Sequence, residues 1–176
     1  MAYKNIPFGE VEAFNVLIEI PEGSYNKYEY DEEFDEIKLN FVFWGDCKFP
    51  HNYGLVFGTH AGDGDHLDCI VLNPVPLAIG TVVKCRAIGI IETVDRGETD
   101  NKLIAVPVCC EAYGNVKSAE DLPDNFGKIY KDFYKLVGIQ KNKVIEVGGV
   151  FGKEKAVEEL NKTKIKNLWK SRAKEK

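Results

Sequence analysis

The sequence predicts one α+β domain that is mainly β, an antiparallel barrel or sandwich with its helices in the C-terminal third. The chain has 176 residues, the length of one ordinary domain with one hydrophobic core. Several β-rich runs follow one another without long helical patterns between them, which favours an antiparallel barrel or sandwich over a βαβ sheet. Helical periodicity begins only near residue 118.

The predicted strands are runs rich in β-branched and aromatic residues, separated by turn signals such as Pro21–Ser24. A first helix is predicted from Ser118 or Pro123 to about Val137, because apolar residues recur there at helical spacing. A second helix is predicted over about Lys153–Arg172, with an apolar stripe and a lysine-rich face. The strands are predicted at Phe14–Ile20, Lys27–Asp31, Glu36–Trp44, Leu67–Leu72, Thr81–Val94, Leu103–Val108 and Lys143–Val147.

Charge and composition narrow the class of function. The net charge is −5, yet residues 153–176 hold nine Lys or Arg against four Asp or Glu, so the acidic side chains are concentrated in residues 1–152. This concentration of negative charge disfavours nucleic acid as a partner. It suits divalent cations, which bind oxygen ligands. No apolar run approaches the roughly 18 residues of a membrane span, and no secretory signal is evident. We therefore expect a cytoplasmic protein with neither a membrane nor a nucleic-acid partner.

The most informative segment is Asp63-Gly64-Asp65-His66-Leu67-Asp68, which places three carboxylates within six residues, directly before an apolar strand. Carboxylates this close repel one another, and a bound divalent ion removes that cost. A solvated acidic turn is the alternative interpretation, because short acidic turns are common. The spacing does not fit an EF-hand loop, because a strand follows it and not a helix.

A second acidic group runs from Asp95 to Asp100 at the end of a long predicted strand, where a plain hairpin loop is the alternative. Glu19 and Glu29 lie within strand-like runs, and alternation puts Lys27 on the same face as Glu29. An acid on an inward face is costly unless a cation pairs with it. A barrel mouth with these side chains would hold several Mg²⁺ ions and a polyphosphate.

From about Phe14 to Leu160 the chain resembles the soluble family I inorganic pyrophosphatases. The blocks that carry the resemblance are Ile18–Pro21, Lys27–Glu29, Phe49–Gly54, Asp63–Asp68 and Asp95 to Pro107. The resemblance implies an OB-like five-stranded antiparallel barrel with flanking C-terminal helices. It also implies Mg²⁺-dependent hydrolysis of pyrophosphate to two phosphates by a metal-activated water, with Mn²⁺ or Zn²⁺ as substitute metals. A homohexamer is implied as well.

The resemblance also implies the roles of individual residues. Asp65 would activate the attacking water, while Tyr53, Lys27 and Lys102 act beside it on the phosphate oxygens. Tyr134 and Lys135 are the nearest match to a phosphate-binding Tyr-Lys pair on the helix after the barrel. The implied metal ligands are Asp63, Asp65, Asp68, Asp95, Asp100 and Glu19, and the implied substrate contacts are Lys27, Glu29, Tyr53, Lys102, Tyr134 and Lys135.

Two positions depart from the family pattern. Phe41 stands where the family has a phosphate-binding Arg, so we expect Lys38 or Lys48 to supply that charge or substrate binding to be weaker. His66 stands where the family has Pro, most simply as a tolerated turn substitution. Two other functions therefore stay open at this point: a metal and pyrophosphate binding module without catalysis, and a hydrolase of a larger phosphate ester.

Overall fold

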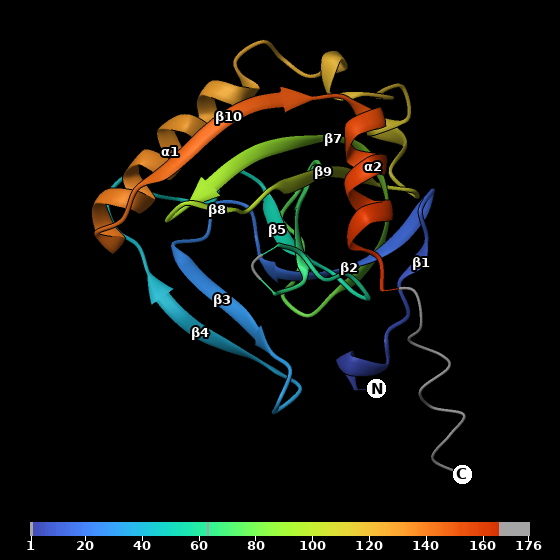
Figure 1. Cartoon of the computed structure of the whole chain (residues 1–176), viewed down its shortest axis with the longest axis horizontal. Coiled ribbons are helices and arrows are strands. Elements are labelled where there is room, and N and C mark those ends of the chain that lie inside the picture. Colours follow the sequence, from blue (N-terminus) through green and yellow to red (C-terminus); the bar gives the residue numbers. More distant parts are fainter. Residues whose placement is uncertain (1, 63, 166–176) are drawn as a thin grey trace.

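Five strands close into a barrel in the computed structural model, which describes residues 2–62 and 64–165 (Figure 1). In order around the ring, β2 pairs with β5, β5 with β6, β6 with β9, β9 with β7, and β7 pairs again with β2. The strands are β2 (Ala13–Ile20), β5 (Asn52–Val56), β6 (Leu67–Val71), β7 (Val82–Asp95) and β9 (Lys102–Pro107). The five-stranded barrel that the resemblance implies is thus confirmed.

One pairing in the ring differs from the expected antiparallel arrangement. β6 and β9 run parallel, with Asp68 opposite Lys102, whereas the other four pairings are antiparallel. A parallel pair needs a long connection. Here the connection includes the whole of β7, which lies on the other side of β9 in the ring.

The remaining elements cover the barrel and frame one side of it. β3 (Asn26–Asp31) and β4 (Glu36–Val42) form a separate hairpin, drawn at the lower left in Figure 1. Helix α1 (Phe126–Lys141) packs along β10 (Ile145–Phe151), which pairs with β7, and α2 (Lys153–Thr163) packs on β7. The short strands are β1 (Gly9–Glu10) and β8 (Glu98–Thr99), and the 3₁₀ turns are Tyr3–Asn5, Glu111–Tyr113 and Ala119–Asp121.

Three hydrophobic clusters hold the described elements together, and the two largest join the helices to the barrel. One joins barrel residues such as Ile70 and Ile104 to the aromatic side chains of α1, and the other joins Phe14 and Leu67 to Leu160 of α2. The barrel strands contribute side chains to both clusters because successive strand residues face opposite sides of the sheet. None of the described helices is both long and apolar enough to span a bilayer.

The predicted strands agree with the structure to within a few residues, but β5 is absent from the prediction. All five residues of β5 are buried, so the segment shows no alternation of apolar and polar side chains. Gly54 lies at its centre, where a Cβ atom would be 1.9 Å from the Leu17 carbonyl oxygen. Glycine therefore permits the close approach of β5 to β2 while weakening the strand signal.

The helices differ from the predictions mainly at their ends. α1 begins at Phe126 and continues to Lys141, one turn beyond the predicted end at Val137, and Asn142 closes it in the left-handed conformation with φ 48°. α2 spans Lys153–Thr163, and the part of the predicted helix from residue 166 to 172 lies outside the described residues.

Candidate active site

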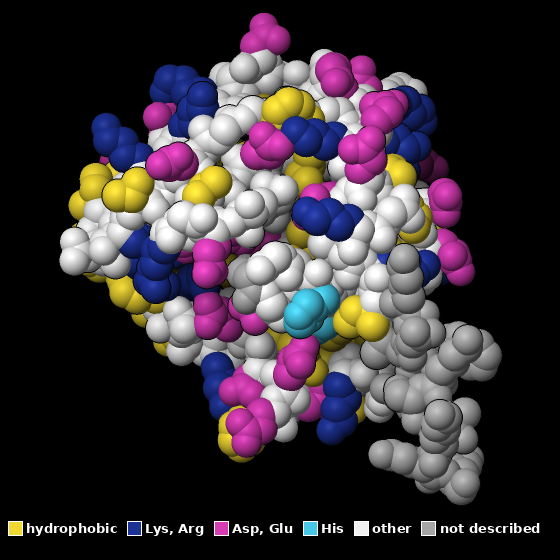
Figure 2. Space-filling model, viewed as in Figure 1, with side chains coloured by type: hydrophobic (Ala, Val, Ile, Leu, Met, Phe, Trp, Pro, Cys, Tyr) yellow, Lys and Arg dark blue, Asp and Glu magenta, His cyan; other side chains and the backbone are white. Residues whose placement is uncertain are grey.

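A cavity of about 540 Å³ opens between the barrel, the β3–β4 hairpin and the C-terminal half of α1. Figure 2 shows acidic and basic side chains side by side on this part of the surface, between the end of α1 and the hairpin. Ten of the predicted site residues line the cavity: Glu19, Lys27, Glu29, Tyr53, Asp65, Asp68, Asp95, Asp100, Lys102 and Tyr134. Side chains that are distant in the sequence are thus brought to one place.

Local irregularities in the strands occur where site residues are found. The pairing of β2 with β5 shifts register between Ile18 and Ile20, which is the position of Glu19. The pairing of β3 with β4 shifts between Lys27 and Tyr28. Bulges bend a strand and re-aim its side chains, and they are frequent next to active sites.

Lys102 lies at the centre of the charged network. Its Nζ is 2.6 Å from Asp68 Oδ2 and also forms an ion pair with Asp100, while only 3% of the side chain is exposed. Tyr53 donates a hydrogen bond of 2.8 Å to the same Asp68 oxygen. Burial alone would lower the pKa of the Lys102 ammonium, but Asp68, Tyr134 and Asp100 together raise it above its ordinary value. Lys102 is therefore a fixed positive charge.

Glu19 is the most deeply buried carboxyl group of the cavity, with 6% of the residue exposed. Its Oε1 accepts a hydrogen bond of 2.6 Å from the backbone N–H of Tyr30. Burial, and next the negative charge of Asp68, raise the pKa of Glu19 from 4.5 to about 8. In the metal-free chain this carboxyl group therefore holds a proton at neutral pH.

Replacing Glu19 with glutamine is expected to make the metal-free protein more stable at pH 8 than the wild type. Because folding raises the pKa of Glu19 from 4.5 to about 8, the free energy of unfolding falls as the pH rises through this window. Glutamine has no proton to lose, so the fall should become smaller. Urea unfolding at pH 5 and pH 8 in EDTA measures the slope, with exposed Glu12→Gln as the control. Equal slopes in wild type and Glu19→Gln would contradict the assignment.

The oxygen atoms of the cavity suit a hard divalent cation. Asp95 Oδ1 is buried and accepts no hydrogen bond from the described residues, while Asp95 Oδ2 pairs with Lys143. Across residues 2–62 and 64–165, no three acidic, His or Cys side chains converge on one point at metal-ligand distances. The ammonium group of Lys102 instead lies between the Asp68 and Asp100 carboxylates. An all-carboxylate donor set with an unsatisfied buried oxygen fits Mg²⁺.

The two remaining predicted residues are Asp63 and Lys135. Asp63 is outside the described residues. Lys135 lines a neighbouring cavity of about 500 Å³, and the Tyr134 ring borders both cavities.

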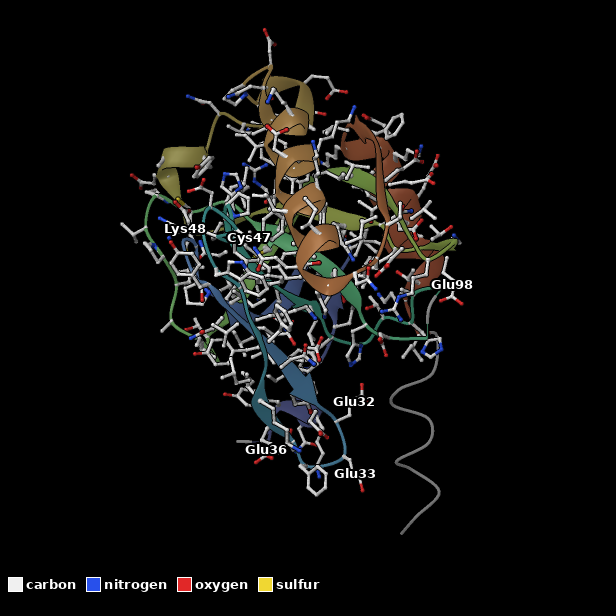
Figure 3. The ribbon with its side chains drawn as sticks, turned by 90° about the vertical axis from the view of Figure 1, so that its left-hand side faces the viewer. Glu32, Glu33, Glu36, Cys47, Lys48 and Glu98 are labelled. Carbon is white, nitrogen blue, oxygen red and sulfur yellow. The ribbon has the colours of Figure 1, made fainter. Side chains whose placement is uncertain are left out.

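The two lysines expected to replace the missing Arg do not line the larger cavity. Lys38 pairs with Asp31 and Glu36, and Lys48 lies over the Tyr25 ring. In Figure 3 Lys48 is on the opposite side of the molecule from Glu98, which marks β8 next to the cavity.

Three further cations line the cavity and were missed in the sequence: Arg96, Lys141 and Lys143. Arg96 lies in the turn between β7 and β8, and the two lysines flank Asn142 at the end of α1. The Lys-Asn-Lys sequence at a helix end is the signal that could have found the lysines, since a left-handed Asn closes a helix and turns the chain back.

His66 ties the acidic loop to the hairpin. Its Nδ1 is 3.0 Å from the Thr59 carbonyl oxygen, and its Nε2 is 2.6 Å from a carboxylate oxygen of Glu32. Figure 3 shows Glu32 at the tip of the β3–β4 hairpin. Proline has no side-chain nitrogen, so a proline at this position would not provide the link.

Comparison with known proteins agrees with this geometry. The family model described as inorganic pyrophosphatase matches residues 16–167. The inorganic pyrophosphatase of Thermoplasma volcanium is 39% identical over 158 residues, which cover 88% of this chain and 94% of that protein. The Geobacillus stearothermophilus inorganic pyrophosphatase is 42% identical over 146 residues, covering 83% and 87%.

Solved structures give the same result. The crystal structure of inorganic pyrophosphatase from Thermus thermophilus superimposes with a TM-score of 0.85 at 33% identity, covering 92% of this chain and 95% of that one. Fold, sequence and the cavity residues lead to one assignment. The chain belongs to the inorganic pyrophosphatase family.

Proposed function

We propose that this chain hydrolyses inorganic pyrophosphate to two phosphates with the help of bound Mg²⁺. The observation that carries the proposal is the cavity itself, where carboxylates from three barrel strands, the hairpin and adjoining loops face lysines from β3 and β9. Pyrophosphate carries several negative charges, so it needs cations on several oxygens at once. Membership of the inorganic pyrophosphatase family supports the choice of substrate.

The metal ligands proposed here are Asp65, Asp68, Asp95, Asp100 and Glu19, with Asp63 as a further ligand outside the described residues. The buried, unsatisfied Asp95 Oδ1 and the all-oxygen donor set support this assignment. When bound, divalent metal ions acidify water and neutralise charge on phosphate oxygens. Mg²⁺ is the expected ion, and Mn²⁺ or Zn²⁺ could take its place.

The chain's own groups bind the substrate and move the proton. Lys27 and Lys102 hold phosphate oxygens by charge-assisted hydrogen bonds, and Glu29 keeps Lys27 in position through its ion pair. Tyr53 stays protonated, because burial and the Asp68 charge raise its pKa well above the ordinary value, so it acts as a hydrogen-bond donor. Tyr134 lies beside it, and Lys135 remains a predicted phosphate contact. Asp65 accepts the proton of the attacking water.

The test is phosphate release from pyrophosphate by the purified protein with Mg²⁺, compared with EDTA, Mn²⁺ and Zn²⁺. Rapid release with Mg²⁺ and none in EDTA is the expected result. ATP in a parallel assay tests hydrolysis of larger phosphate esters. Binding of pyrophosphate by calorimetry without any release would contradict the proposed reaction and favour a binding module.

Self-association and location remain predictions. A homohexamer would have about six times the 19.8-kDa mass of the chain in light scattering. Exposed Trp44, Ile139 and Val144 are consistent with burial against further copies of the chain. A cytoplasmic location is likewise a prediction from the sequence.

A further inference from the structure

The cavity has a basic side formed by Lys27, Arg96, Lys141 and Lys143. Two of these cations have acidic partners, since Lys27 pairs with Glu29 and Lys143 pairs with Asp95. Lys141 forms no ion pair with any residue in the described part of the chain. Figure 2 shows the gathering of basic side chains near the C-terminal end of α1.

Lys141 is held at the cavity by the end of α1 and by an aromatic ring. It is the last residue of the helix, directly before the left-handed Asn142. Its Nζ lies 5.4 Å from the centroid of the Phe41 ring, within the range of a cation–π contact. Phe41 is opposite Lys27 in the β3–β4 pairing, so the ring places Lys141 beside the Lys27 strand.

The surroundings of Lys141 favour an anion. Burial lowers its pKa, and the positive charges of Lys27, Lys143 and Arg96 lower it further, while Glu29 acts in the opposite direction. A partly desolvated ammonium among like charges gains more from a bound anion than a solvated one does.

We propose that Lys141 binds a phosphate oxygen of pyrophosphate. The inference rests on the proposed function, because pyrophosphate is the ligand. Phe41 takes part indirectly, as the surface on which the lysine lies. The positive charge that an Arg at position 41 would provide thus comes from the end of α1.

A purely structural role for Lys141 makes a different prediction. A basic residue in the last turn of a helix interacts favourably with the negative end of the helix dipole. If this were its whole contribution, Lys141→Met would lower the melting temperature slightly and leave substrate binding unchanged. If Lys141 binds phosphate, the same variant loses affinity for the substrate.

The experiment compares Lys141→Met, Lys141→Arg and the control Lys128→Met by steady-state kinetics with pyrophosphate and Mg²⁺. Lys128 is on the same helix, exposed and paired with Asp132. We expect Lys141→Met to raise KM about 10-fold or more, since a charge-assisted hydrogen bond is lost. Lys141→Arg should stay within about 3-fold of the wild type, and Lys128→Met should be unchanged.

Moving the positive charge from position 141 to position 41 makes the test more specific. Because the Lys141 Nζ lies over the Phe41 ring, an Arg at position 41 would bring its guanidinium to the same region. Phe41→Arg combined with Lys141→Met is therefore expected to recover most of the lost affinity. Circular dichroism checks that the double variant is folded, and the three single variants decide the question if it is not.

Calorimetry with the non-hydrolysable analogue imidodiphosphate tests the role of Lys141 separately from the proposed hydrolysis of pyrophosphate. Weaker binding by Lys141→Met supports the role of Lys141 whether or not the wild type turns pyrophosphate over. Unchanged KM and unchanged imidodiphosphate binding in Lys141→Met would overturn the inference and leave the proposed hydrolysis standing. Absence of turnover in the wild type would overturn the hydrolysis alone.

Discussion

Replacing Asp65 with asparagine is expected to lower the rate of phosphate release from pyrophosphate by at least about 100-fold. Asparagine has the same shape as aspartate but cannot accept a proton, and general-base catalysis contributes about 10²–10⁴ in rate. Asp65 lines the cavity within a turn closed by the Ala61 N–H, which donates to the Asp65 carbonyl oxygen. Asparagine can keep this backbone contact, and circular dichroism checks that the variant is folded.

The measurement is kcat with saturating Mg²⁺ and pyrophosphate. Glu98→Gln is the matched control, because Glu98 is exposed on β8 and does not line the cavity. Its kcat should equal that of the wild type. Unchanged turnover in Asp65→Asn would remove the proposed role of Asp65 as the proton acceptor.

Replacing Lys102 with methionine is expected to affect both activity and stability. The substitution removes a phosphate contact and leaves Asp68 and Asp100 without their cation, so kcat/KM should fall by at least about 100-fold. Breaking a buried ion pair on one side costs about 3 kcal/mol. Urea unfolding in EDTA measures this loss, which should shrink when Mg²⁺ is added, because the metal then neutralises the carboxylates.

Lys155→Met is the control for the Lys102 variant. Lys155 also pairs with a carboxylate on β7, Glu92, but both side chains are about 40% exposed. Such a pair contributes about 1 kcal/mol or less, and it is remote from the cavity. Equal losses of stability in the two variants would show that the buried ion pairs of Lys102 stabilise the fold no more than an exposed pair does.

Much of the candidate site could be predicted because most of its carboxylates lie in short acidic segments of the sequence. The segments around Asp65 and Asp95 are dense in carboxylates, and ten of the predicted residues do meet at one cavity. The predicted strands are continuous runs of β-rich residues, and they include β9, although all six of its residues are buried. β5 is absent from the prediction because Asn52 and Gly54 interrupt its apolar run.

Lys141 and Lys143 could not be assigned from the sequence, since their position depends on where α1 ends. A lysine near a helix end is ordinarily a solvated residue. One additional turn beyond Val137, followed by Asn142, brings both lysines to the cavity. The ion pair of Lys143 with Asp95 depends in turn on the pairing of β10 with β7, a contact between distant segments.

The parallel pairing of β6 with β9 also determines when the site forms during folding. Asp68 and Lys102 are register partners, although β7 separates their strands in the chain. Closing so long a loop has an entropic cost that local hairpins avoid, and non-local pairing slows folding. A kinetic intermediate with an open barrel would therefore lack the ion pair between Lys102 and Asp68. We expect recovery of enzymatic activity during refolding to coincide with the slowest structural phase and not with the formation of the β3–β4 hairpin.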